Sequence, residues 1–264
     1  MTQDERLDFL IEAFKVEAKG YEKLCVPADR DGKRQLLRGL MNVRMPGPMS
    51  AEVLAVQDAY LRERAEEKGV VRLDDIPVIR DGLSVWQGDI TRLAVDAIVN
   101  AANSAMLGCF VPGHNCIDNC IQTYAGVQMR AECDRQMKLL KQEYGQSYVQ
   151  PTAIPLLTDG YNLPAKEVVH IVGPIVTGAL THRHRTELAD CYTNTLDLCM
   201  REGLTSLAFC CISTGVFHFP NEEAAEIAVN TVRGWQETHG NAMERIIFNV
   251  FKDEDKKYYE TLMR

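Results

Sequence analysis

Three residues whose side chains commonly bind metal ions lie close together in the sequence: Cys109, His114 and Cys116. A carboxylate, Asp118, follows two positions after the last of them. A proline–glycine pair within the segment favours a turn over a helix, and a loop can bring all three ligands to one point. Two thiolates and an imidazole suit zinc, and three protein ligands leave a fourth coordination position open, as in catalytic zinc sites.

Buried cysteine side chains offer a second explanation of the same segment. Cysteine often packs as a small apolar residue. The pattern Cys-x4-His-x-Cys is also not one of the standard zinc-finger spacings. The spacing alone therefore leaves a metal loop and a pair of packed thiols open, and the surrounding elements have to decide between them.

The composition of the chain is that of an ordinary globular protein. Its 264 residues, 46% of them apolar and 25% charged, are enough for one large domain or two smaller ones. The net charge of −8 disfavours nucleic-acid binding, because the phosphate backbone would be repelled. No apolar run reaches the roughly 18 residues that span a bilayer, and the charged N-terminus lacks a signal-peptide core. We therefore expect a cytoplasmic chain without a membrane partner, whose nine cysteines do not form a disulfide framework.

The N-terminal quarter of the sequence is predicted to be helical. Apolar spacing predicts helices over residues 5–18, 29–40 and 50–68, and Ser50 is placed to cap the last of them. These helices carry no recognisable metal, nucleophile or phosphate pattern. We expect residues 1–75 to form an extension that packs on the main domain or closes over its site.

Beyond this extension, short β-branched runs alternate with helical patterns. The alternation predicts a layered α/β fold with a mainly parallel sheet. Ligands of such sheets bind outside the carboxyl ends of the strands, which directs attention to the loops after Val99, Val172 and Ile212. We expect strands over residues 83–87, 95–100, 153–157, 168–172, 206–212 and 245–251, and helices over residues 117–144, 186–202, 221–238 and 254–263.

The loop after the 95–100 strand carries two amides, Asn100 and Asn103. Amide groups offer donors and acceptors to the hydroxyls of a sugar. Asparagine also favours turns in general, so these residues alone do not identify a site. Upstream, Asp89 follows a strand and a glycine, where its carboxylate can accept from an exocyclic amine or cap the next segment.

The loop after the 206–212 strand has the composition of an anion site. Ser213, Thr214 and Gly215 offer backbone N–H groups and hydroxyls. The helix that follows, for which Asn221 is the expected N-cap, adds its positive end. Phe217 can stack on a ribose or a base.

Together these segments resemble the macrodomain family, which binds ADP-ribose. The motifs that carry the resemblance are Gly88-Asp89-Ile90-Thr91, residues 96–103, and Ile212-Ser213-Thr214-Gly215 followed by an aromatic residue and Pro220. The resemblance implies a three-layer α/β/α macrodomain over residues 76–264, with a mixed, mainly parallel sheet and an ADP-ribose cleft at its crest.

The resemblance also implies roles for individual residues. Asp89 and Ile90 would contact the adenine end of ADP-ribose, and Asn103 would face the distal ribose. Asp118 matches the acid that hydrolytic macrodomains use near that ribose, although it is followed by Asn119 where glycine is usual. The residues that would wrap the diphosphate are Ser213, Thr214, Gly215, Val216 and Phe217, with His218 at a position that is often glycine.

The metal-binding residues make the resemblance more specific. The segment that holds Cys109, His114 and Cys116 replaces the glycine run of common macrodomains. It is similar to the zinc-dependent macrodomains of bacteria, which also carry an N-terminal helical extension. Members of that subgroup are associated with a sirtuin-type protein ADP-ribosyltransferase and a lipoate-carrying protein related to the glycine-cleavage carrier. The implied cofactor is zinc, held by these three residues.

The activity implied by this resemblance is zinc-dependent hydrolysis that removes ADP-ribose from a protein carboxylate and reverses sirtuin-type mono-ADP-ribosylation. Zinc can polarise the scissile ester or bind ribose hydroxyls. Asp118 would orient a water or act as a base, and Asn103 would hold the ribose. Two alternatives stay open: a reader that binds ADP-ribose without chemistry, and a hydrolase of small derivatives such as O-acetyl-ADP-ribose.

The remaining histidines and cysteines have structural explanations. His170 lies in an apolar strand and is expected to be a core residue. His182 and His184 are expected in a solvated polar loop. Cys120 is near enough to the metal segment to be a spare ligand. Packing accounts for Cys191, Cys199, Cys210 and Cys211.

Overall fold

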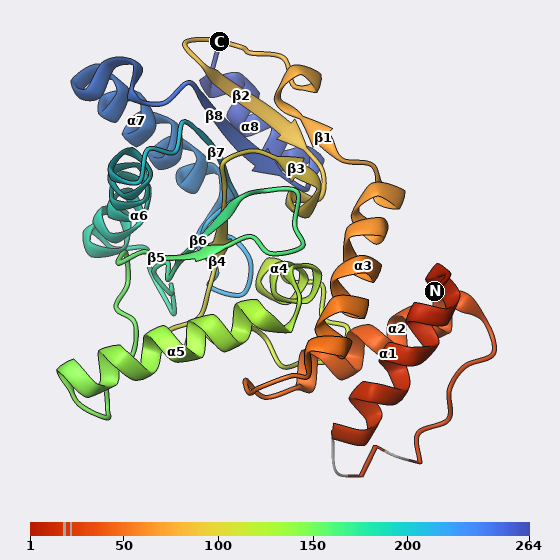
Figure 1. The fold of residues 1–264 in the computed structure, drawn as a ribbon. Helices are drawn as coiled ribbons and strands as arrows, with labels where there is room; N and C mark the ends of the chain where they lie inside the picture. Colours follow the sequence, from red (N-terminus) through yellow and green to blue (C-terminus); the bar gives the residue numbers. More distant parts are fainter. Residues whose placement is uncertain (18–19, 22) are drawn as a thin grey trace.

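A six-stranded sheet lies at the centre of the molecule (Figure 1). The structure, a computed structural model, describes residues 1–17, 20–21 and 23–264. Every neighbouring pair of strands in this sheet is parallel except that of β5 and β6, which confirms the predicted mixed, mainly parallel sheet. The strands are, in their order across the sheet, β2 (Leu83–Gln87), β8 (Arg245–Val250), β7 (Ser206–Phe209), β4 (Ala97–Ala101), β6 (Glu167–Ile171) and β5 (Leu156–Asp159).

Helices cover the sheet in two groups (Figure 1). In one group α4 and α5 pack together, and they contact β4 and β5 respectively. In the other group α6, α7 and α8 contact one another in succession, and α8 packs on β2 and β8. This arrangement confirms the expected three-layer α/β/α fold. The helices are α4 (Ile117–Ala125), α5 (Val127–Tyr144), α6 (His182–Arg201), α7 (Asn221–His239) and α8 (Asp253–Leu262).

The central strands β4, β7 and β8 are buried on both faces, as expected for strands with helices on either side. β4 pairs with β6 along its whole length. Its ladder with β7 covers Ala97 and Ile98, near the start of the strand. The carboxyl end of β4 continues beyond this ladder toward the candidate site. A short parallel pair, β1 (Val71–Arg72) with β3 (Leu93–Ala94), lies outside the main sheet.

Several predicted boundaries are wrong for local reasons. The helix predicted over residues 117–144 is interrupted at Gly126, whose φ of 101° separates α4 from α5. The strand predicted over residues 153–157 begins at Leu156, because the positive φ of Ala153 (64°) is incompatible with an extended strand. β7 ends at Phe209, and the residues up to Ile212 belong to the loop.

The start of one helix and the cap of another also differ from prediction. α6 begins at His182 because the Thr181 hydroxyl caps it, accepting a hydrogen bond from His184 N at 3.3 Å. His182 and His184 therefore lie in a helical turn and not in a polar loop. Asn221 is the first residue of α7 and not its N-cap, because Pro220 O already accepts from the first helical turn. The Asn221 side chain instead donates to Asp255 Oδ1 of α8 (2.6 Å).

The N-terminal segment forms three helices: α1 (Gln3–Glu17), α2 (Arg30–Val43) and α3 (Ala51–Lys68). Ser50 caps α3 as predicted, since its hydroxyl accepts from Val53 N at 3.3 Å. The predicted last residue of the first helix, residue 18, lies outside the described residues. None of the helices in the described part of the chain is both long and apolar enough to span a membrane. The buried residues that hold these helices together are Leu7, Leu10, Ile11, Phe14, Leu37, Leu40, Met41, Tyr60 and Leu61, with Val127 of α5.

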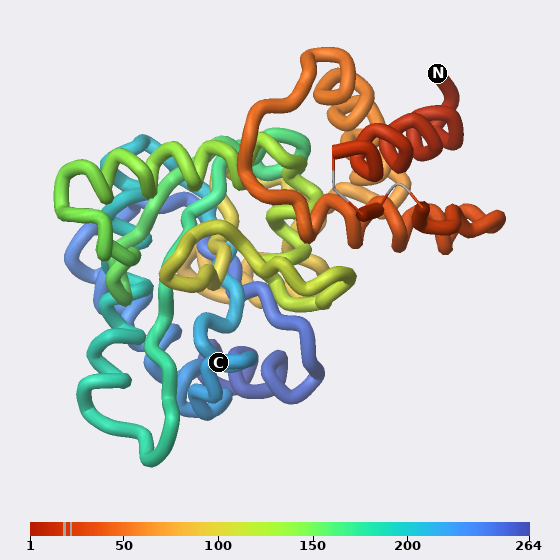
Figure 2. The backbone as a smooth tube through the Cα atoms, turned by 90° about the horizontal axis from the view of Figure 1, so that it is seen from below, coloured from red at the N-terminus to blue at the C-terminus, as the bar shows by residue number. Residues whose placement is uncertain are grey.

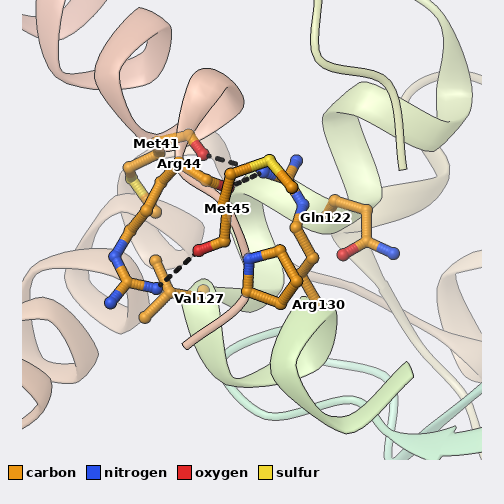
Figure 3. Close-up of a pocket in the computed structure, with 8 residues that line it drawn as sticks. Met41, Arg44, Met45, Gln122, Val127 and Arg130 are labelled. Carbon is orange, nitrogen blue, oxygen red and sulfur yellow. Dashed lines mark hydrogen bonds between the residues drawn. The ribbon is translucent and has the colours of Figure 1, made fainter. Parts of the chain in front are cut away.

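A buried arginine joins these helices to the main domain (Figure 3). Arg130 of α5 is 5% exposed, and its Nη1 donates to the carbonyl oxygens of Met41 (3.3 Å) and Arg44 (2.5 Å). These carbonyls belong to the end of α2, where the helix dipole favours a positive charge. The cavity beside them, about 10 Å³, holds at most one water. The end of α2 is therefore hydrogen-bonded to α5.

A half-buried carboxylate ties the start of β4 to two other segments. Asp96 Oδ2 accepts from Thr205 N, Thr205 Oγ1 and Ser206 N, each at 3.0 Å. Asp96 Oδ1 accepts from Lys166 Nζ at 2.7 Å. Burial favours the neutral acid, but the four hydrogen bonds outweigh it and hold the pKa of Asp96 well below its usual range.

We expect Asp96→Asn to lower the free energy of unfolding by about 1–3 kcal/mol at pH 7, since hydrogen bonds to a charged group contribute about that much. The pKa of Asp96 is lower in the folded state than in the unfolded state, where it is about 3.9. Its contribution is therefore complete above about pH 4 and is lost as the pH falls further. Urea unfolding at pH 7 and pH 3 should show that the free energies of unfolding of the wild-type protein and Asp96→Asn differ less at pH 3.

The control for this prediction is Asp134→Asn, which removes a surface pair with Lys138. It should change the free energy of unfolding by less than about 0.5 kcal/mol. An Asp96→Asn difference that is the same at pH 7 and pH 3 would contradict the prediction.

Candidate functional site

A cleft of about 1170 Å³ opens at the carboxyl ends of β4 and β7. The loops after these strands, the segment before α4 and the residues after β2 all contribute to its walls. Every site residue predicted from the sequence lines this one cleft. These residues are Asp89, Ile90, Asn103, Cys109, His114, Cys116, Asp118, Ser213, Thr214, Gly215, Val216 and Phe217.

The carboxylate of Asp118 is held between two amides. Its Oδ1 accepts from Asn100 Nδ2 at 2.9 Å, and its Oδ2 accepts from Asn103 Nδ2 at 3.2 Å. Burial raises the pKa of Asp118 to about 6, against the opposing effects of the Asn100 bond, the Arg130 charge and the Asn103 bond. Each carboxylate oxygen keeps a lone pair for a further donor. Asp118 is therefore an oriented acid or base at the wall of the cleft.

A second layer of hydrogen bonds holds Asn100 in place. Asn100 Nδ2 lies 3.0 Å from His170 Nδ1, and His170 Nε2 lies 3.0 Å from Thr158 Oγ1. Because Asn100 Nδ2 is a donor, Nδ1 of His170 accepts and its Nε2 carries the proton. Burial lowers the pKa of His170 to about 4. His170 is the core residue that was predicted, and its contacts also support the cleft.

The three candidate metal ligands converge in the wall of the cleft. The ligand atoms of Cys109, His114 and Cys116 lie within 4.8 Å of one another, and Cys109 Sγ is 3.5 Å from His114 Nδ1. A tetrahedral zinc ion with ordinary bond lengths separates a sulfur and a nitrogen ligand by about 3.6 Å. The donor set and its spacing therefore fit zinc.

Two cysteines at the start of α4 have different surroundings. Cys116 is the N-cap, and its Sγ accepts from Asn119 N at 3.4 Å. Burial, together with the neighbouring Cys109 and Asp118, raises the pKa of Cys116 to about 12. Cys120, considered as a spare ligand, lies one turn later in the cleft wall, and its sulfur is 3.4 Å from Arg38 Nη2.

Asp89 lies in the wall of the same cleft. Its Oδ1 accepts from the backbone N (3.0 Å) and the hydroxyl (2.6 Å) of Thr91, so that it does cap the short turn Ile90–Arg92. Its Oδ2 accepts from Lys68 Nζ at 3.2 Å. Burial favours the neutral acid, but Lys68 and Thr91 outweigh it and lower the pKa of Asp89. The cap and the proposed ligand contact thus use the same carboxylate.

The loop after β7 turns sharply along the cleft. Ser213 and His218 have positive φ angles of 65° and 58°. Glycine adopts this conformation without strain, which explains why glycine suits the position of His218. Gly173 packs so closely that a Cβ there would lie 2.1 Å from Ser213 Oγ. The curled loop presents the segment between Ser213 and His218 to the cleft.

Two further cleft residues, Arg38 of α2 and Tyr124 of α4, were not predicted, and neither was Lys68 of α3, which contacts the cleft residues Tyr124 and Asp89. Arg38 lines the cleft, and Lys68 Nζ lies 3.3 Å from the centroid of the Tyr124 ring. Arginine and lysine are common on the polar faces of helices, so that neither stood out. Phe251, 76% exposed in the cleft wall, follows the carboxyl end of β8 and was detectable by the strand-end rule.

Comparisons with known proteins agree with this geometry. Residues 99–228 match the family model described as Macro domain. A protein-ADP-ribose hydrolase from Treponema medium is 50% identical, over 100% of each chain. A protein-ADP-ribose hydrolase from Staphylococcus aureus strain MRSA252 is 45% identical, over 97% of this chain and 94% of that protein.

Solved structures give the same result for the fold. The crystal structure of a Trypanosoma brucei macrodomain in complex with ADP-ribose is 28% identical, with a TM-score of 0.65 over 86% of this chain and 95% of that one. The chain therefore belongs to the macrodomain family.

Proposed function

We propose that this protein is a zinc-dependent hydrolase that removes ADP-ribose from modified protein side chains. The observation that carries the proposal is the position of Asp118, an oriented buried carboxylate beside three candidate zinc ligands in one cleft. A module that only binds ADP-ribose needs neither feature. The names of the two full-length relatives support the same activity.

The bound ADP-ribose is proposed to lie along the cleft from Asp89 to Asp118. Asp89 and Ile90 contact the adenine end, where the carboxylate accepts from the exocyclic amine. Asn103 faces the distal ribose and already bonds Asp118 and Gly108 O (3.1 Å). The diphosphate is wrapped by Ser213, Thr214, Gly215, Val216 and Phe217, whose backbone N–H groups suit an anion.

The chemistry is proposed to take place at the distal ribose. Cys109, His114 and Cys116 would hold zinc, which when bound supplies a Lewis acid for the oxygen atoms of the scissile ester. Asp118 orients a water and takes its proton. Water adds across the bond between the ribose and the side-chain carboxylate, and the products are ADP-ribose and a free carboxylate.

The wider biological proposal rests on the resemblance to the bacterial zinc subgroup. We infer that the enzyme reverses mono-ADP-ribosylation by a sirtuin-type transferase and that its protein substrate is a lipoate-carrying, glycine-cleavage-like carrier. In this proposal residues 76–264 form the ADP-ribose-binding macrodomain, and residues 1–75 form the helical extension.

We expect Asp118→Asn to reduce kcat for hydrolysis of a carboxylate-linked ADP-ribosyl protein by about 10²–10⁴-fold, because the amide cannot accept the proton of water. Calorimetric titration should show that the affinity for ADP-ribose changes by less than about threefold. The surface variant Asp134→Asn serves as the control. Full activity of Asp118→Asn would refute its role as a base.

We expect the purified protein to contain about one zinc ion per chain, measured by elemental analysis. Removal of zinc by a chelator should lower hydrolysis at least about tenfold, and added zinc should restore it. Cys109→Ser and Cys116→Ser should lose zinc, whereas Cys120→Ser, a matched change one turn away, should keep it.

Binding and hydrolysis assays of the zinc-loaded protein separate the competing functions. A zinc-loaded protein that binds ADP-ribose but releases none from protein or from O-acetyl-ADP-ribose would be a reader. Hydrolysis of the small ester in the absence of any action on modified protein would identify a small-molecule hydrolase. Either result would overturn the proposed substrate.

A further inference from the structure

The segment that carries the candidate metal ligands has few structural supports of its own. It leaves the Asn103 turn, bends at Gly113 (φ 67°) and enters α4 at Cys116. His114 and Val111 are exposed, and Val111 keeps 57% of its accessible surface. A segment like this holds three ligands in a tetrahedral arrangement if other residues fix its backbone.

Asn119 provides one such support from inside α4. Its side chain is fully buried, and its Nδ2 donates to the carbonyl oxygens of Cys109 (3.2 Å) and Val111 (3.0 Å). Asn119 N also donates to Cys116 Sγ. One residue therefore contacts both cysteine ligands. Glycine, the residue usual at this position in the family pattern, has no side chain to make the two carbonyl contacts.

Arg38 provides the second support from the N-terminal extension. Its Nη2 donates to His114 O (2.7 Å) and to Asn119 Oδ1 (3.0 Å). Its Nη1 donates to Asn115 Oδ1 at 3.1 Å. The Arg38 guanidinium thus joins the backbone of His114 to the side-chain amide of Asn119, which in turn holds the backbone of Cys109. Figure 2 shows this segment, in yellow-green, beside the red and orange helices.

The next turn of α2 reinforces the same contact. Asn42 is fully buried, and its Oδ1 accepts from Gly113 N at 2.9 Å while its Nδ2 donates to Thr123 Oγ1 at 2.6 Å. Gly39 lies between these residues, where a Cβ would approach Pro112 Cβ to 3.7 Å. One face of α2 therefore packs on the metal segment along a full helical turn.

We propose that Arg38 and Asn119 are positioning residues for the metal ligands, which makes helix α2 a part of the metal site. The inference rests on the proposed zinc site, and it assigns the N-terminal extension a role in metal retention. Residues that orient metal ligands typically change affinity by about 10–100-fold when they are removed.

The test measures zinc affinity by competition with a chromophoric chelator, in full-length protein that carries Cys120→Ser so that this sulfur cannot replace a displaced ligand. Arg38→Met and Asn119→Ala should each raise the zinc Kd about 10–100-fold. Because the two residues bond to each other, the double variant should weaken binding by less than the product of the two single effects. Arg38→Lys, which keeps a donor, should recover part of the affinity.

Arg34→Met is the matched control. Arg34 lies one turn before Arg38 on α2 and pairs with Asp31 and Glu67, both within the extension. It should leave the zinc Kd within about twofold of the background protein. Thermal melting of the metal-free proteins separates positioning from folding, since we expect Arg38→Met and Arg34→Met to melt alike.

The outcomes also separate this inference from the proposed function. If the background protein binds zinc and Arg38→Met binds it equally well, or Arg34→Met weakens it as much, the positioning role is overturned. If zinc binding follows the expected order but the zinc-loaded protein hydrolyses no ADP-ribosyl bond, the proposed function fails and the positioning role stands. A background protein that binds no zinc overturns both.

Discussion

The structure depends on the hydrogen-bond donors and the positive charge that stabilise one buried carboxylate, that of Asp118. Asp118 lies 5% exposed, and a charge in that position is costly unless donors and a positive charge surround it. Asn100 comes from the end of β4, Asn103 from the loop beyond it, and Arg130 from α5. Bringing these residues together sets the register between the sheet, the loop and the first helices of the domain. It also leaves an acid with a fixed orientation at the wall of the cleft.

The same arrangement explains why the N-terminal helices belong to the functional site. Arg130, whose charge faces Asp118, is itself bonded to the carbonyls that end α2. Arg38 of α2 bonds to the metal segment, and Lys68 of α3 pairs with Asp89 in the cleft wall. The extension therefore contacts the cleft wall at two places, His114 and Asp89. Its helices pack around a hydrophobic cluster that also includes Val127 of α5.

The fold and the walls of the cleft were predicted well from the sequence, because both depend on patterns within short stretches of the chain. Buried parallel strands such as β4 are continuous apolar runs, and the strand-end rule then selects the loops that follow them. All the predicted site residues line one cleft for this reason. Caps were less predictable, because Thr181 caps α6 through its hydroxyl whereas Pro220 precedes α7 without any side-chain cap, and residue type alone does not decide which residue takes the cap position.

The partners of the site residues could not be predicted. The contacts of Arg38, Asn42 and Lys68 reach across the fold to residues far away in sequence, and their residue types are common on any solvated helix. Asn119 was visible as a departure from the family pattern, but its role requires the carbonyls of Cys109 and Val111 to be placed. Such roles depend on tertiary packing and not on local propensity.

The most direct test of the whole account is a crystal structure of the zinc-loaded protein with ADP-ribose, with diffraction recorded at the zinc absorption edge. We expect one zinc ion bound by Cys109, His114 and Cys116, with its open position toward the distal ribose and Asp118 within reach of a water on that sugar. A zinc ion closed by Cys120 as a fourth ligand, or a ribose that lies away from the metal, would contradict it.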